Sequence, residues 1–147
     1  LITNTTIRPA LYRDFLMHCH TLLDAGFMHE AGQHLLGEHD FSSFRAAGCQ
    51  SRTAMRNVSE LSVKRQGDLI VVEIEANAFL LHMVRNIVGT LLQIGRGDKP
   101  SGWAGELLAL KDRTKAAPTA AAQGLSLIAV RYPAGYGIPV SPSPFWS

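Results

Sequence analysis

Cysteine is scarce in this chain, and its two copies, Cys19 and Cys49, lie far apart in the sequence. Without a Cys-x-x-Cys pair or a dense cysteine framework, we interpret both as reduced thiols, which excludes a disulfide-stapled fold. No apolar run is long enough to span a bilayer, and neither a signal peptide nor a methionine opens the chain. We therefore expect a cytoplasmic protein without a membrane partner, and we interpret the strand-like start at Leu1 as the sign of a fragment.

Motifs for metal binding and for nucleophilic catalysis are missing as well. The sequence has no His-Glu-x-x-His segment and no Cys/His cluster. His29, His34 and His39 are spaced by fives, a spacing that does not hold one face of a helix. There is also no Gly-x-Ser-x-Gly elbow and no Gly-x-x-x-x-Gly-Lys phosphate loop. We therefore expect no metal site.

The net charge is only +2, but the positive charge is unevenly distributed. Residues 41–67 carry five basic side chains against one acidic one (+4), whereas the rest carries nine against eleven (−2). A local basic excess can attract phosphate, although a solvated charged edge explains the same pattern. The five basic residues are Arg45, Arg52, Arg56, Lys64 and Arg65.

The composition is that of an ordinary globular domain, with 46% apolar and 18% charged residues. Hydrophobic periodicity and the Gly and Pro breaks predict a strand, a helix capped by Asp24, a hairpin turning at Gly67, two helices and a last strand. Their ranges are 1–6, 25–36, 60–64, 69–75, 77–95, 101–110 and 125–132. The proline-rich tail over 133–147 is expected to be irregular.

The predicted hairpin has one apolar and one polar face, because Leu61 and Val63 share a side with Ile70, Val72 and Ile74 in antiparallel pairing. Without the helix at 101–110, the element order is β-α-β-β-α-β, the ferredoxin-like plan. The sequence therefore predicts an α+β fold in which helices cover one face of a four-stranded antiparallel sheet.

The long helix is the most informative element, because its polar residues fall within one stripe roughly 140° wide at about 100° per residue. Surface helices usually carry many Lys and Glu residues, but this helix has a single charge, Arg85. A partly buried guanidinium needs an acid or a phosphate, and no Asp or Glu lies within a turn of it. The partner must come from another strand, another domain or RNA, with a structural ion pair as the alternative. The stripe consists of His82, Arg85, Asn86, Gly89, Thr90 and Gln93.

A four-stranded sheet with a free face is also the plan of the RNA-recognition motif. That module stacks bases on aromatic side chains of its central strands. The strand predicted over 69–75 has no aromatic residue and carries Glu73 and Glu75 instead. An isolated RNA-recognition motif is therefore disfavoured.

Five segments, in order between about Ile7 and Tyr132, together resemble the C-terminal half of the tRNA pseudouridine synthase A (TruA) family. The block Phe-x-x-His-Met-Val-Arg-Asn-Ile-Val-Gly, at its offset from His-Asp-Phe-x-Ser-Phe, is the most specific part of the resemblance. One departure is Leu81, where many members carry a second histidine. The segments are Gly37–Phe44, Ser51–Thr53, Ala76–Gly89, Lys111–Arg113 and Gln123–Leu127.

The resemblance implies conversion of uridine to pseudouridine on the 3′ side of the tRNA anticodon stem-loop (tRNA positions 38–40), with no cofactor. The target nucleotide must leave its stack and enter a pocket, as it does for other base-modifying enzymes. An aspartate acts on the nucleotide, a tyrosine stacks on the base, and an arginine pairs with the aspartate. The family fold joins two ferredoxin-like halves across a cleft, and its members are homodimers that bind tRNA.

Carried over to this sequence, the arginine is Arg85, and Leu125 matches the apolar residue that packs beside the target base. The family's aspartate lies in an Arg-Thr-Asp segment, of which Arg52-Thr53-Ala54 is only an echo, so residues 1–132 correspond to the C-terminal domain alone. We expect this domain to need the N-terminal half of the same protein for catalysis. RNA contacts are expected from Arg45, Arg52, Arg56, His82 and Asn86.

Two other hypotheses fit the same residues. A non-catalytic RNA-binding module would use the basic segment without any chemistry. A generic α+β domain would use Arg85 only as a structural ion pair.

Overall fold

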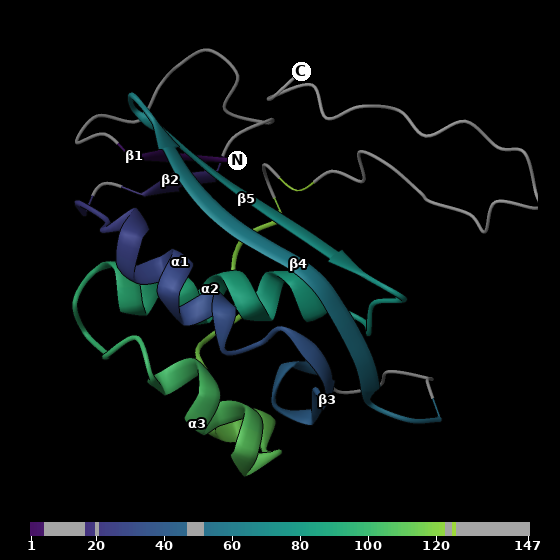
Figure 1. Ribbon diagram of the computed structural model, residues 1–147. Helices are drawn as coiled ribbons and strands as arrows, with labels where there is room; N and C mark the ends of the chain where they lie inside the picture. Colours follow the sequence, from purple (N-terminus) through teal and green to yellow (C-terminus); the bar gives the residue numbers. More distant parts are fainter. Residues whose placement is uncertain (5–16, 20, 47–51, 123–124, 126–147) are drawn as a thin grey trace, which may run out of the picture.

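The computed structural model describes residues 1–4, 17–19, 21–46, 52–122 and 125 (Figure 1). Within these ranges the predicted order of strand, helix, hairpin and two helices is confirmed, and so is the α+β class. The predicted last strand, apart from Leu125, and the tail over 133–147 lie outside the described residues. The elements are β1 (Ile2–Asn4), β2 (Met17–Cys19), α1 (Ala25–Gln33), β3 (Gly37–Asp40), η1 (Ser42–Phe44), β4 (Met55–Gln66), β5 (Leu69–Ala76), α2 (Met83–Gly95), α3 (Trp103–Leu110) and η2 (Arg113–Lys115).

The hairpin of β4 and β5 forms the centre of the sheet, in the register that the alternating pattern predicts. Leu61 lies opposite Ile74 and Val63 opposite Val72, so their side chains share the inner face. Gly67 turns the chain at φ +61°, in the left-handed region that favours glycine. The inner face thereby becomes one wall of the hydrophobic core.

The five strands of the sheet have the order β2-β1-β5-β4-β3. β1 runs antiparallel to β5, as the ferredoxin-like plan requires, and β2 pairs with β1 in parallel. β3 is a strand that the sequence pattern did not predict, because Gly37–Asp40 has no alternating apolar residues. Its pairing with β4, from Gly37 opposite Val58 to Asp40 opposite Met55, forms the strand instead.

The helices gather on one side of the sheet, and α1 lies directly on β4 (Figure 1). Asp24 caps α1 as predicted, since its side chain accepts a 3.0 Å hydrogen bond from the amide of Phe27. The helix ends at Gln33 rather than at Leu36. Gly32 allows the close approach, because a Cβ atom there would meet Leu61 Cδ2 at 2.2 Å.

Helix α2 begins at Met83, several residues later than predicted, because His82 adopts a left-handed conformation with φ +59°. Its apolar side, with Ile87, Leu91 and Ile94, is buried in the core. The predicted stop is confirmed, as α2 ends at Gly95. The next helix, α3, begins after Gly102, which occupies the cap position without a side-chain hydrogen bond. Among the described residues, no helix is long and apolar enough to cross a membrane.

Candidate functional site

The polar stripe of α2 is covered by the chain that follows η2. This chain, residues 117–120, is named here the strap. The amide of Ala120 donates to the carbonyl oxygen of Arg85 at 3.1 Å. In return, Arg85 Nε donates to the carbonyl oxygen of Ala120 at 2.8 Å. Around Arg85 the stripe is therefore a docking surface for the protein's own backbone, whereas His82 at its start is exposed.

Gly89 permits this docking because the strap passes where a side chain would otherwise stand. A Cβ atom at position 89 would lie 2.2 Å from the carbonyl oxygen of Pro118. Real Cβ atoms essentially never approach that closely. The small residue in the stripe thus sets the distance between α2 and the strap.

Asn86 is the meeting point of three segments that are far apart in the sequence. Its side chain is fully buried, and Nδ2 donates to the carbonyl oxygen of Phe44 at 2.8 Å. Oδ1 accepts from Arg113 Nη2 at 3.1 Å and from Thr119 Oγ1 at 2.6 Å. Both ends of the amide are satisfied, which makes the buried polar network stable rather than costly.

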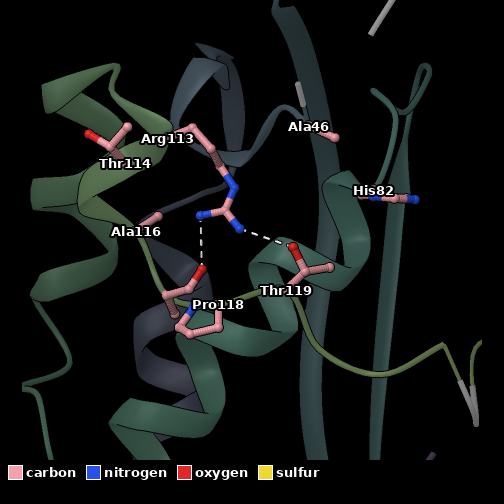
Figure 2. Close-up of a pocket in the computed structure, with 8 residues that line it drawn as sticks. Ala46, His82, Arg113, Thr114, Ala116, Pro118 and Thr119 are labelled. Carbon is pink, nitrogen blue, oxygen red and sulfur yellow. Dashed lines mark hydrogen bonds between the residues drawn. The ribbon is translucent and has the colours of Figure 1, made fainter. Parts of the chain in front are cut away.

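Arg113, which lies in η2, hydrogen-bonds both to the strap and to Asn86. Its Nη1 donates to the carbonyl oxygen of Ala117 at 2.9 Å, and its Nη2 also donates to Thr119 Oγ1 at 3.0 Å. Figure 2 shows the guanidinium reaching from η2 between these two partners. One planar group therefore holds two residues of the strap and one residue of α2.

The turn that presents Arg113 is built by the two residues before it. Lys111 ends α3 in a left-handed conformation at φ +52°. Asp112 then caps η2, accepting from the amide of Thr114 at 3.0 Å and from its hydroxyl at 2.6 Å. These bonds, the hydroxyl of Thr114 first, lower the pKa of Asp112 below its ordinary value. Each residue of Lys111-Asp112-Arg113 thus has a separate structural role.

Ser43 joins this turn to the segment around Phe44. Its buried hydroxyl donates to the carbonyl oxygen of Leu107 at 2.5 Å and accepts from the amide of Asp112 at 2.9 Å. Phe41 and Phe44 flank it, both fully buried in the core. The segments Gly37–Phe44, Ala76–Gly89 and Lys111–Arg113 therefore converge at one place.

A surface cavity of about 560 Å³ opens beside this convergence (Figure 2). His82 borders it at the start of α2, and its positive φ is a strained backbone conformation of the kind that clusters at binding sites. Arg113 forms another part of the wall. The lining residues are Ala46, His82, Arg113, Thr114, Ala116, Ala117, Pro118 and Thr119.

Arg85 is half-buried, and among the described residues it has no carboxylate partner. The only hydrogen bond that its guanidinium makes within these residues is the Nε contact with the carbonyl oxygen of Ala120. A guanidinium has five donors, so the four N–H groups on the two Nη atoms remain for another acceptor. The geometry favours a carboxylate or phosphate that binds end-on to both Nη atoms, because Nε is already used.

The predicted basic residues lie at different places along β4. Arg52 is exposed before the strand, whereas Arg56 turns back to donate through Nη1 to the carbonyl oxygens of Thr53 and Met55 at 3.1 and 2.7 Å. At the other end of β4, Arg65 donates to the carbonyl oxygen of Leu23 at 2.9 Å. Arg45 is half-buried and belongs to the first end, where Asp40 pairs with Met55. The hydroxyl of Ser42 is the main cause of the lowered pKa of Asp40, and the nearby charges of Lys111 and Arg45 add to it.

Two further predicted site residues, Leu125 and Asn86, differ in solvent exposure. Leu125 is exposed, with 52% of its surface accessible, so it can meet a partner. Asn86 is not accessible to RNA, because its side chain is fully buried and used inside the protein. No group of three or more metal-ligating side chains occurs in the part of the chain that the structure describes.

Sequence patterns did not reveal the strap or the role of Arg113. Thr119 lies in an alanine-rich stretch without periodicity, so no local signal marked it. The only available sign was the Lys111–Arg113 triplet, whose partners are distant in sequence. Gly89 was identified within the stripe, but its close contact with Pro118 depends on tertiary structure.

The fold and this network define an α+β domain in which the strap holds the guanidinium of Arg85 through the carbonyl oxygen of Ala120. The family described as tRNA pseudouridine synthase matches residues 31–133. The chain belongs to this family, which confirms the resemblance found in its sequence.

Curated relatives agree with this assignment. The chain is 55% identical to tRNA pseudouridine synthase A of Idiomarina loihiensis over 99% of this chain and 56% of that protein. It is 56% identical to tRNA pseudouridine synthase A of Aeromonas salmonicida, over 99% of this chain and 55% of that protein. The protein of the same name from Histophilus somni is 56% identical over 97% of this chain and 53% of its own length. The chain therefore spans about half the length of the curated relatives it matches.

Proposed function

We propose that this chain is the C-terminal part of an enzyme that isomerises uridine to pseudouridine in the anticodon stem-loop of tRNA. The proposal depends on the surroundings of Arg85. The carbonyl oxygen of Ala120 fixes its Nε, while its Nη atoms have no carboxylate partner among the described residues. An aspartate from the N-terminal half of the same protein would be its partner. A bidentate arginine pair would orient that carboxylate towards the target nucleotide.

Other residues take roles beside this pair. Leu125 packs against the target base, for which its exposed side chain is suitable. His82 and the cavity that it borders lie at the start of α2, one turn before Arg85. The reaction moves the base from nitrogen to carbon attachment on the same sugar, so it requires no cofactor in this proposal.

Binding of tRNA is assigned to the basic end of β4. Arg45, Arg52 and Arg56 surround the start of that strand and would meet phosphates of the stem. Arg52 is the most accessible of the three. The active assembly in this proposal is a cytoplasmic homodimer in which each tRNA is bound by both subunits.

Complementation tests the enzymatic proposal. The chain is mixed with a separately produced N-terminal half, and tritium release is measured from tRNA labelled at the uracil carbon that forms the new bond. Release from the mixture, but from neither half alone, is the expected result. If the mixture stays inactive while the intact enzyme works, this chain is not simply half of an active site.

A non-catalytic RNA-binding module is the second candidate, favoured by the exposed Arg52 alone. It predicts salt-dependent binding of tRNA by this chain without any tritium release after complementation. Absence of binding at low salt would rule out that candidate.

A further inference from the structure

We propose that Arg113 is a positioning residue for Arg85, acting through the strap. The proposal rests on the function proposed above, because it concerns how the reactive arginine is oriented. Arg113 touches neither Arg85 nor the reacting atoms in this proposal. It fixes the backbone that fixes Arg85.

The first step is the fixation of the strap. Arg113 holds the carbonyl oxygen of Ala117 at 2.9 Å and the hydroxyl of Thr119 at 3.0 Å. The two bonded residues directly precede and follow Pro118, so the backbone is held on both sides of this proline. Its carbonyl oxygen faces Gly89 so closely that no side chain fits between them.

The second step anchors this assembly to the core. Arg113 Nη2 and Thr119 Oγ1 both donate to Oδ1 of Asn86, at 3.1 and 2.6 Å. Asn86 is fully buried and is held in turn by the carbonyl oxygen of Phe44. A buried amide with its partners in place has one favoured geometry, and Asn86 passes it to the half-buried Arg113 and the exposed Thr119.

The third step transmits this geometry to Arg85. Ala120 directly follows Thr119, and its amide and carbonyl groups both bond to Arg85, at 3.1 and 2.8 Å. A shift of the strap therefore moves the acceptor of Arg85 Nε and turns the guanidinium. Since displacement of a catalytic group by about 1 Å can cost on the order of 100-fold in rate, small shifts matter.

The variants Arg113→Lys and Thr119→Val test this chain of contacts. Lysine keeps the positive charge but has no planar fork with which to bond Ala117, Thr119 and Asn86 together. Valine keeps the shape of threonine and removes the hydroxyl. Thr119→Ser, which keeps the hydroxyl, and Lys115→Ala, which removes an exposed charge from the same turn, are the matched controls.

Two measurements separate positioning from plain stability. Hydrogen exchange of the Arg85 Nε–H group, followed by NMR in this chain, reports its bond to Ala120 without requiring activity. In the intact enzyme, kcat is measured separately from the Kd for tRNA. We expect Arg113→Lys and Thr119→Val to speed exchange at least about tenfold and to lower kcat roughly 10- to 100-fold, with Kd unchanged. The two controls should match the wild type in both measurements.

Unchanged exchange of the Arg85 Nε–H group in both variants would overturn the proposal, as would equal losses in kcat and Kd that follow the folded fraction. If Arg113→Lys does not fold, Thr119→Val against Thr119→Ser decides. An intact enzyme that is inactive before any substitution refutes the proposed function instead, and the exchange measurement still decides the positioning role.

Discussion

Arg85 and the backbone of Ala120 hold each other through two hydrogen bonds that run in opposite directions, one to the backbone of Arg85 and one from its side chain. Ala120 donates its amide to the carbonyl oxygen of Arg85 at 3.1 Å, and Arg85 donates Nε to the carbonyl oxygen of Ala120 at 2.8 Å. Within the described part of the chain, only one of the five guanidinium donors of Arg85 is used. The arrangement fixes the plane of the group while leaving its outer edge for a partner.

Replacement of Arg85 should therefore affect turnover far more than folding. Arg85→Ala removes one internal hydrogen bond, which contributes about 1 kcal/mol to stability. In the intact enzyme it also removes the partner of a carboxylate, which costs about 1.5–3 kcal/mol, or on the order of 10- to 100-fold in kcat. The measurements are tritium release from labelled tRNA and urea unfolding of the same preparations.

Arg85→Lys is the informative companion to that variant. Lysine retains the charge but cannot bond the Ala120 carbonyl and a carboxylate in the same fork geometry. We expect it to remain closer to Arg85→Ala than to the wild type in kcat. Loss of folding as severe as the loss of turnover would instead indicate a structural ion pair.

Gly89→Ala should displace the strap from α2. The new Cβ would lie 2.2 Å from the carbonyl oxygen of Pro118, whereas ordinary contact begins near 3.4 Å, so the strap must move by about 1 Å. Overpacking of this kind costs about 1–3 kcal/mol, partly offset by the better helix propensity of alanine. Thermal unfolding of the chain is expected to shift to lower temperature.

Gly102→Ala is the matched control for this substitution. Gly102 has φ −68°, and a Cβ added there meets nothing within 4 Å. Alanine should therefore be neutral or stabilising by about 0.4–1 kcal/mol through the unfolded chain. If both glycine variants unfold at the wild-type temperature, the close contact at Pro118 is not a constraint on the fold.

Local patterns predicted those parts of the fold that depend on local rules. The hairpin register of Leu61 and Val63 follows from period-two alternation, and the helix start at Asp24 follows from its capping side chain. The start of α2 was misplaced, because the apolar run continues through Leu80 whereas His82 turns left-handed. That turn depends on tertiary contacts, such as the bond from the Ala46 amide to the carbonyl oxygen of Leu81 at 3.1 Å.

The sequence indicated which residues share the polar face of α2, but not which segment covers that face. The single charge in an apolar helix predicted that Arg85 needs an acidic or phosphate partner from elsewhere, and this stays a prediction; in the described residues its side chain bonds the carbonyl oxygen of Ala120. The same stripe suggested that Asn86 faces RNA, but the strap and Arg113 bury it. A helix pattern shows which residues share a face, and it cannot show which distant segment will cover that face.

Asp40 should make the stability of the chain depend on acid pH. The hydroxyl of Ser42 donates to Asp40 Oδ1 at 2.5 Å and, with smaller contributions from its amide, Lys111 and Arg45, lowers the pKa of this carboxyl below 3.8. A depressed folded-state pKa gives stability that is present above the unfolded pKa and is lost as pH falls through the folded pKa. The difference in unfolding free energy between wild type and Asp40→Asn should therefore shrink below about pH 4.

Ser42→Ala provides the check on the cause, because it removes the hydroxyl that contributes most to the lowered pKa. Its unfolding free energy, measured by urea titration across the acid range, should approach that of Asp40→Asn in its pH dependence. Parallel curves for wild type and Asp40→Asn down to strongly acid pH would refute the assignment to this carboxyl.

Binding of tRNA should depend on one end of β4 and not on total charge. Arg45, Arg52 and Arg56 belong to the start of the strand, whereas Lys64 lies eight residues beyond Arg56, roughly 25 Å away. Each phosphate contact contributes about 0.7–0.9 to the slope of log K against log salt. The triple alanine variant of the first three residues should therefore lose about 2 from that slope, measured by filter binding at several KCl concentrations.

A control triple of Lys64, Arg96 and Lys99 removes the same charge from positions away from the start of β4. If the basic end of β4 is the tRNA contact, the control keeps the wild-type slope, because surface charges separated by more than about 10 Å are largely screened at 0.1 M salt. Among single variants, Arg52→Ala should reduce the salt slope most, because Arg56 Nη1 already donates to the carbonyl oxygens of Thr53 and Met55. Equal losses in both triples would show that tRNA responds to net charge alone, and the assignment of a binding face to the start of β4 would then be wrong.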